Sequence, residues 1–239
     1  MLRVANFTKC YDDSTAVSDL SFEAGPGVVL GLIGPNGAGK TTTLRALAGV
    51  LTPTRGTLEI AGVDLIANPV AAKAQLAYVP DDPPEFYDLT VAEHLAFYAS
   101  IYGILDADVR ADALLEEFQL AHKRDALARD LSRGMRQKLA ICCALLHSPR
   151  ALLFDEPMTG LDPPGIRQLK AAIQRCAAEG AAIVVSSHLL AMVDDICTHI
   201  LILHQGKAKF SGRHADLRAQ FSAGDAASLE EIFFMATGG

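Results

Sequence analysis

The stretch Gly34-Pro35-Asn36-Gly37-Ala38-Gly39-Lys40-Thr41 decides the fold of this chain, because it matches G-x-x-x-x-G-K-[ST] at every fixed position. An apolar run of strand type, residues 28–33, precedes it, and residues 41–48 have the pattern of a helix. A strand, a glycine-rich loop and a helix in this order form a P-loop, whose backbone N–H groups surround phosphate oxygens. We therefore predict an α/β fold with a nucleotide-phosphate site, rather than a chance glycine-rich turn.

The loop also predicts which side chains contact the nucleotide. The helix that follows places its partial positive charge against the phosphates. The Lys40 ammonium reaches the β- and γ-phosphates, and the Thr41 hydroxyl ligates Mg²⁺. Thr42 is the next residue and is predicted to contact the nucleotide as well.

Two acidic residues end a second apolar strand, Leu152-Leu153-Phe154-Asp155-Glu156. Such a strand delivers Asp155 to the edge of the sheet where nucleotides bind, and we predict that it holds Mg²⁺ through water. Glu156 points elsewhere and is predicted to polarise the attacking water as a general base. The alternative, two acids that merely cap a strand, is disfavoured by the Gly160-Leu161-Asp162 loop that follows.

Further motifs lie around these two in a fixed order. They are Tyr11 before the P-loop, Leu131-Ser132-Arg133-Gly134-Met135 before the acidic pair, and His188 after it. The whole series resembles that of the ATP-binding-cassette (ABC) ATPases, and the resemblance covers almost the whole chain. It implies ATP as the nucleotide and hydrolysis to ADP and phosphate. It also implies that Tyr11 stacks on adenine, that His188 contacts the γ-phosphate and orients Glu156, and that Asp162 belongs to the nucleotide-contacting set.

Residues 131–135 resemble the Leu-Ser-Gly-Gly-Gln signature of that family. Ser132 and Gly134 match, whereas Arg133 and Met135 depart, a pattern associated with an exporter branch. Ser132 is also a good N-cap for the helix that follows it. By resemblance, Ser132 and Gly134 contact the γ-phosphate bound to a second cassette, so two head-to-tail copies bury ATP between them. Homodimer and heterodimer remain equally open.

Asp81 departs from the family pattern, because a glutamine usually follows the strand that ends Tyr78-Val79-Pro80. That glutamine touches the metal and the attacking water. Aspartate is a competent ligand for hard cations, so Asp81 is a candidate Mg²⁺ ligand. The other interpretation is an Asp-Asp-Pro-Pro turn without a metal role.

The motifs divide the chain into parts. We predict a nucleotide-binding domain at residues 1–215, a P-loop NTPase core whose mixed sheet is flanked by helices, with an N-terminal antiparallel β portion. A helical subdomain at about 83–148 is inserted into it, and opens with a capping box at Thr90 and Glu93. Residues 216–239 are predicted to be an extension with a short amphipathic helix.

The composition of the chain bears on its cellular compartment and on its partners. No apolar run approaches the ~20 residues of a membrane helix, and the first residues lack a signal-peptide pattern. Five cysteines without CxxC spacing indicate free thiols in a reducing cytoplasm, and a net charge of −7 without a basic stripe argues against nucleic-acid binding.

The resemblance further implies a membrane-spanning permease on a separate chain as partner. The segment at residues 82–90 resembles the region that receives the permease, with Phe86 and Tyr87 as apolar anchors. The chain is then expected in the cytoplasm, held at the inner face of the membrane through the permease. The end of the chain, residues 229–233, resembles the C-terminal pattern of stand-alone cassettes of ABC-2-type exporters, which favours export over import. The rival class is a cassette that acts on ribosomes or nucleic acid.

Overall fold

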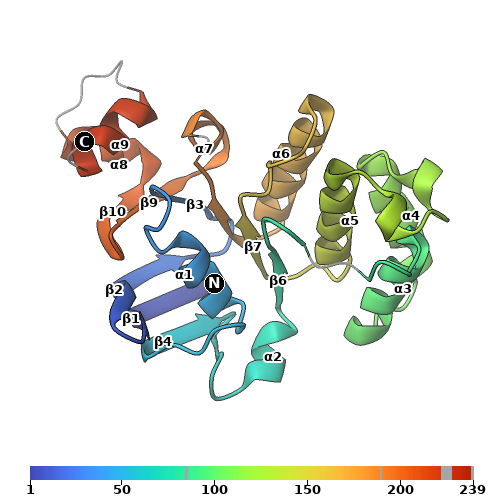
Figure 1. Ribbon diagram of the computed structural model, residues 1–239, viewed down its shortest axis with the longest axis horizontal. Coiled ribbons are helices and arrows are strands. Elements are labelled where there is room, and N and C mark those ends of the chain that lie inside the picture. The colour runs from blue at the N-terminus through green and yellow to red at the C-terminus, as the bar shows by residue number, and fades with distance from the viewer. Residues whose placement is uncertain (84–85, 189, 222–227, 238–239) are drawn as a thin grey trace.

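The computed structural model describes residues 1–83, 86–188, 190–221 and 228–237, which form two β-sheets and their covering helices (Figure 1). The strands are β1 (Leu2–Tyr11), β2 (Ser14–Ala24), β3 (Val29–Ile33), β4 (Arg55–Ile60), β5 (Val63–Asp64), β6 (Leu76–Val79), β7 (Ala151–Asp155), β8 (Ala182–Ser186), β9 (His199–His204) and β10 (Lys207–Arg213). The helices are α1 (Lys40–Leu47), α2 (Pro69–Lys73), α3 (Val91–Tyr102), α4 (Ala107–Glu117), α5 (Arg133–Leu145), α6 (Pro163–Ala178), α7 (Leu190–Ile196), α8 (His214–Gln220) and α9 (Leu229–Thr237), with 3-10 turns η1 (Ala121–Lys123) and η2 (Ala128–Asp130).

The larger sheet has six strands in the order β10-β9-β3-β8-β7-β6. Its strands are parallel from β9 to β6, and only β10 runs antiparallel, as the second strand of a hairpin turned at Gln205 and Gly206. The smaller sheet, β2-β1-β4-β5, is antiparallel throughout. The predicted fold class, a mixed sheet flanked by helices with an N-terminal antiparallel β portion, is confirmed.

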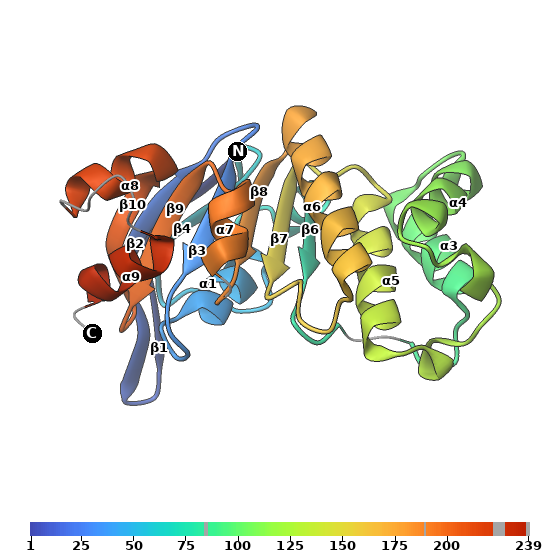
Figure 2. The same ribbon diagram turned by 90° about the horizontal axis from the view of Figure 1, so that it is seen from above.

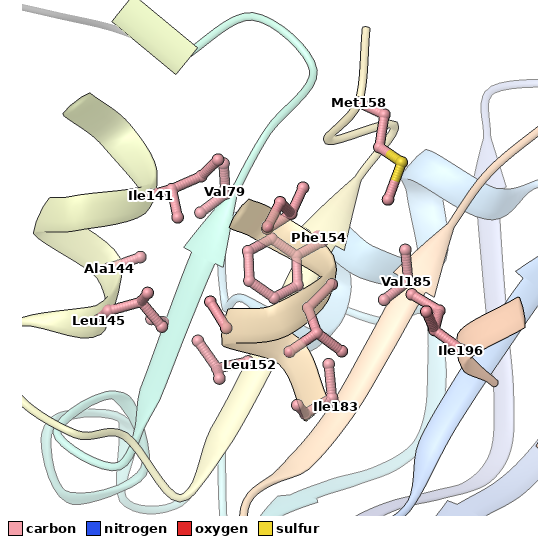
Figure 3. Packing of buried hydrophobic residues seen from close by; sticks show 14 of the residues in the cluster. Val79, Ile141, Ala144, Leu145, Leu152, Phe154, Met158, Ile183, Val185 and Ile196 are labelled. Atoms are coloured by element: carbon pink, nitrogen blue, oxygen red, sulfur yellow. The ribbon is translucent and has the colours of Figure 1, made fainter. Parts of the chain in front are cut away.

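The central parallel strands β3, β7 and β8 are buried along their whole length, which explains why they are continuous apolar runs. Successive side chains of a strand point to opposite faces. In β8, Ile183 and Val185 join a core with the helices of one face, whereas Ala182 and Val184 join a core with α1 and the antiparallel sheet. Figure 3 shows the first of these cores, where Phe154 lies between side chains of α5 and β8.

The parallel strands bring the sequence motifs to one edge of the sheet. β3 ends at Ile33, immediately before the P-loop. β7 ends at Asp155, which pairs in register with Ser186 at the end of the neighbouring strand β8. The P-loop, the acidic pair and the segment leading to His188 therefore leave the sheet at the same edge, as expected for a nucleotide site.

The region between β6 and β7 is helical and lies at one end of the molecule, opposite α8 and α9 (Figures 1 and 2). Helix α3 begins with the predicted capping box, in which Thr90 accepts a hydrogen bond from the Glu93 amide and Glu93 accepts one from the Thr90 amide. Helix α8, which the sequence did not predict, spans the position of the predicted limit at residue 215. The domain limits themselves stay a prediction.

Element boundaries differ from the sequence expectation by a residue or two. Helix α1 begins at Lys40 rather than at residue 41, because Gly39 has the left-handed conformation that starts it. Strand β3 begins at Val29 rather than at residue 28. Within the described residues, no helix combines the length and the apolar character that crossing a bilayer requires.

Candidate active site

Lys40 lies at the centre of the site and is only 7% exposed. Its ammonium donates hydrogen bonds to the carbonyl oxygens of Gly34 (2.7 Å) and Pro35 (3.4 Å) of the same loop. The ammonium is also 4.0 Å from Glu156 Oε1. Burial lowers the pKa of Lys40, and the carboxylates of Glu156 and Asp155 act in the opposite direction. The loop thus holds a buried cation beside two carboxylates.

Two glycines of the loop are required by close contacts. A Cβ on Gly34 would lie 2.2 Å from the Leu203 carbonyl oxygen. Gly39 has a φ of 106°, and a Cβ there would lie 2.8 Å from the Ala16 carbonyl oxygen. A larger residue at either position would push the loop off β9 or β2.

The remaining residues of the loop differ in exposure. Ala38 is buried and anchors the loop, and its amide donates to the Pro35 carbonyl oxygen at 3.1 Å. Three residues at the tip are exposed, as is the residue after Lys40: Pro35, Asn36, Gly37 and Thr41. Thr42 is half-buried. The exposed tip leaves backbone N–H groups accessible to an anion.

Asp155 is 2% exposed, and hydroxyl groups contact both of its carboxylate oxygens. The Ser186 hydroxyl donates to Oδ1 at 2.6 Å, and the Tyr78 hydroxyl donates to Oδ2 at 3.5 Å. Burial, together with the Asp155 charge, raises the pKa of Tyr78 to about 12, so this hydroxyl stays a donor. Neither hydroxyl contact was predicted from the sequence, although Tyr78 and Ser186 each lie at or near the end of a strand beside β7.

Glu156 has a left-handed backbone with a φ of 48°, uncommon for a residue with a side chain. Its amide donates to the Ser186 carbonyl oxygen (3.2 Å) and hydroxyl (3.1 Å), which holds this turn. The turn directs its carboxylate to His188, whose amide donates to Oε2 at 3.2 Å and whose Nδ1 lies 2.8 Å from the same oxygen. Strained backbone held by several contacts is typical of functional sites.

The signature residues form a second cluster at the start of α5. The Ser132 hydroxyl accepts a hydrogen bond from the Met135 amide at 3.3 Å, as predicted for an N-cap. Gly134 packs against the turn at Gly160, where a Cβ on Gly134 would lie 2.5 Å from the Gly160 carbonyl oxygen. Glycine at 134 is therefore required by packing within this chain.

Asp162 and Asp81 both contact cations of this second cluster. Asp162 caps α6 by accepting from the Gly165 amide at 3.0 Å, and lies 3.3 Å from the Lys138 ammonium. Asp81 Oδ1 is 3.7 Å from the Arg133 guanidinium. Both members of the Asp81–Arg133 pair are about half exposed. The partners of these two aspartates, Lys138 and Arg133, were not foreseen.

The two clusters lie apart. Figure 1 shows α1, which follows the P-loop, on the other side of β6 and β7 from α5, which follows the signature. The chain thus brings together Lys40, Asp155, Glu156 and His188, but leaves the signature residues elsewhere. Tyr11 is also separate, at the exposed turn between β1 and β2, with the Lys9 ammonium 5.0 Å from its ring centroid.

Known proteins are similar to this chain over most of its length. The sequence model of the family described as ABC transporter matches residues 17–159. The chain is similar to the ABC-type transporter ATP-binding protein EcsA of Bacillus subtilis (strain 168), with 34% identity over 99% of this chain and 96% of that protein. It is similar to the Nod factor export ATP-binding protein I of Cupriavidus metallidurans, with 35% identity over 91% of this chain and 72% of that protein. A solved structure titled "Structure of ATP binding subunit of ABC transporter" superposes with a TM-score of 0.95 and 36% identity, covering 99% of both chains.

Proposed function

This chain belongs to the ABC transporter family, and we propose that two such cassettes close head to tail around ATP to drive export through a separate permease. As a member of the family it binds ATP and is an ATPase that energises a transporter. A role on ribosomes or nucleic acid is not favoured. The cluster of Lys40, Glu156 and His188 supports the hydrolytic part of this proposal.

The catalytic roles follow from this cluster. Glu156 accepts a proton from the attacking water as general base, because its carboxylate lies within 4.0 Å of Lys40 at the phosphate loop. His188 orients that carboxylate through two contacts to Oε2, and it would contact the γ-phosphate of bound ATP. The P-loop amides and Lys40 hold the phosphates, together with Thr42.

The donor set at the end of β7 fits Mg²⁺. Mg²⁺ is usually held by one or two protein ligands, with phosphate oxygens and waters completing its coordination. Asp155 supplies a buried carboxylate, and Thr41 supplies a hydroxyl at the start of α1. When bound, the ion neutralises charge on the β- and γ-phosphates. Asp81 is a third candidate ligand, although Arg133 competes for its carboxylate.

The separation of the two clusters supports a composite site. Ser132 and Gly134 lie at the N-terminus of α5, an anion-binding position, with β6 and β7 between this helix and α1 of the same chain. A second cassette, identical or different, is proposed to bring its own signature to this ATP. Asp162 lies beside the signature and would enter the same interface, whereas Tyr11 is proposed to stack on the adenine.

The permease is proposed to dock near the start of α3. Phe86 and Tyr87 are 51% and 62% exposed, and with Leu89 and Phe97 they line a cavity of about 570 Å³. The Phe86 ring lies edge-on to Phe97, with centroids 5.0 Å apart. Exposed aromatic side chains beside a hollow are suited to anchor a partner. Pro84 and Glu85 of the predicted segment lie outside the described residues.

Docking there would hold the cassette at the cytoplasmic face of the membrane, with no nucleic acid as partner. The export direction is supported by the similarity to a protein named for Nod factor export. It also agrees with the Arg133 and Met135 departures in the signature.

The composite site is tested by the mass of the Glu156→Gln variant in light scattering, with and without Mg-ATP. Glutamine keeps the size of the side chain but removes the proposed base, so bound ATP persists and holds two copies together. The expected result is a mass that doubles only when Mg-ATP is present. A monomer that binds ATP without doubling would contradict closure between two copies of this chain.

A further inference from the structure

The contact between Tyr78 and Asp155 connects the proposed metal carboxylate to the neighbouring strand. Tyr78 belongs to β6, whose register places it opposite Leu153 of β7, two residues before Asp155. Its hydroxyl reaches past the strand to Asp155 Oδ2 at 3.5 Å. The Arg45 side chain of α1 faces the same hydroxyl and lowers the pKa of Tyr78, against the effects of burial and of Asp155. Three elements thus meet at this one hydroxyl.

The contact matters because Asp155 is almost fully buried. A buried carboxylate without donors is costly, and here Ser186 contacts only Oδ1. Without the Tyr78 hydroxyl, Oδ2 would lose the side-chain donor that it has in this structure, and the carboxylate would be free to turn about the Ser186 contact. Donors of this kind orient a metal-ligating side chain and typically change metal affinity about 10- to 100-fold when removed.

We propose that Tyr78 is a positioning residue that fixes the Asp155 carboxylate for the metal of Mg-ATP. This inference rests on the proposed metal role of Asp155. The Tyr78 hydroxyl contacts Asp155 and faces Arg45, and its proposed effect on the metal is transmitted through Asp155. Its removal therefore weakens the contribution of Mg²⁺ and leaves metal-free nucleotide binding unchanged.

A matched control lies in the same cavity. Tyr78 and Tyr98 both line a hollow of about 540 Å³ beside β6, to which α1, α3 and α5 also contribute lining residues. Both are partly buried, and burial raises the pKa of Tyr98 to about 12 as well. The groups that act on the pKa of Tyr98 are Cys143 and Tyr102 rather than Asp155. Tyr98→Phe thus deletes the same atom from the same cavity without touching the carboxylate.

The experiment is calorimetric binding of the non-hydrolysable analogue AMP-PNP, in EDTA and at rising Mg²⁺ concentration. For Tyr78→Phe, we expect the AMP-PNP affinity in EDTA to equal that of the wild type. The Mg²⁺ concentration that gives half of the Mg²⁺-dependent increase in AMP-PNP affinity should be about 10-fold higher. Tyr98→Phe is expected to match the wild type throughout. In ATP hydrolysis, excess Mg²⁺ should restore kcat of Tyr78→Phe, which a packing defect would not allow.

Three outcomes separate the possibilities. A Tyr78→Phe titration equal to wild type, or an equal shift in both tyrosine variants, overturns the role of Tyr78. Asp155→Asn is the reference for the metal role itself. If Asp155→Asn leaves the Mg²⁺ dependence unchanged, the proposed role of Asp155 fails, and the inference about Tyr78 fails with it. If Asp155→Asn shifts the titration and Tyr78→Phe does not, only the role of Tyr78 fails.

Discussion

The P-loop and the signature segment both lead into the N-terminus of a helix, but their surroundings differ. Lys40 is buried and is joined to Glu156 and the loop carbonyls, and Glu156 is in turn joined to His188. Ser132 is exposed, and its hydroxyl caps α5 by accepting from the Met135 amide. The P-loop is thus part of a preformed site with fixed partners, whereas the signature segment is an open surface.

This difference indicates which interactions form early and which depend on a second copy. Electrostatic contacts in the buried cluster act at low effective dielectric and need no reorganisation. In the proposed composite site, contacts to the signature form only when a second cassette covers it, so they would contribute to closure rather than to first binding. We expect substitutions in the buried cluster to change hydrolysis or ATP affinity in each cassette, and substitutions in the signature to act through the pair.

The largest effect is expected for Glu156→Gln in the buried cluster. Loss of the general base should lower kcat by about 10²- to 10⁴-fold, whereas ATP affinity stays near the wild-type value because Lys40 and the loop are unchanged. Phosphate release and equilibrium nucleotide binding measure the two quantities separately. If kcat and ATP affinity fell by the same factor, Glu156 would not be the general base.

A smaller effect, on binding, is expected for Lys40→Ala. This substitution removes a charge-assisted contact to phosphate, so ATP affinity should fall about 10- to 100-fold. Lys170→Ala is a suitable control, because Lys170 pairs with Asp195 at 2.6 Å on α6 and α7, away from the loop. Titrating each variant with ATP, under conditions in which the protein is a monomer, measures the affinity. Retained affinity in Lys40→Ala would show that the loop amides hold the phosphates alone.

The same contrast explains what the sequence could predict. The P-loop, the N-cap at Ser132 and the strand that ends at Asp155 depend on residues close in sequence, and each has a local pattern. The hydroxyls of Tyr78 and Ser186 reach Asp155 across the sheet, from positions 77 and 31 residues away. These contacts depend on the order of the strands in the sheet, which a local sequence pattern does not predict. Arg133 opposite Asp81 was missed for the same reason.

A still smaller effect is expected for Ser132→Ala in the signature segment. Loss of the N-cap should destabilise the chain by about 1 kcal/mol, and loss of a hydroxyl contact across the interface should lower hydrolysis about 10-fold. Ser228→Ala is a matched control, because Ser228 caps α9 in the same way, with the Glu231 amide 3.2 Å from its hydroxyl. Thermal unfolding and phosphate release measure the two effects. If both variants lose stability and hydrolysis alike, Ser132 is only a cap.

The smallest effect is expected for the Asp81–Arg133 pair, which links the loop after β6 to the signature. Both side chains are about half exposed and 3.7 Å apart, so their coupling in a double-mutant cycle of Asp81→Asn and Arg133→Ala should stay below about 1 kcal/mol. The informative measurement is the Mg²⁺ dependence of hydrolysis in the two single variants. If Asp81 is a metal ligand, Asp81→Asn raises the Mg²⁺ requirement, and Arg133→Ala lowers it by freeing the carboxylate. If Asp81 is only a turn residue, both titrations match the wild type, and the metal site belongs entirely to the buried cluster.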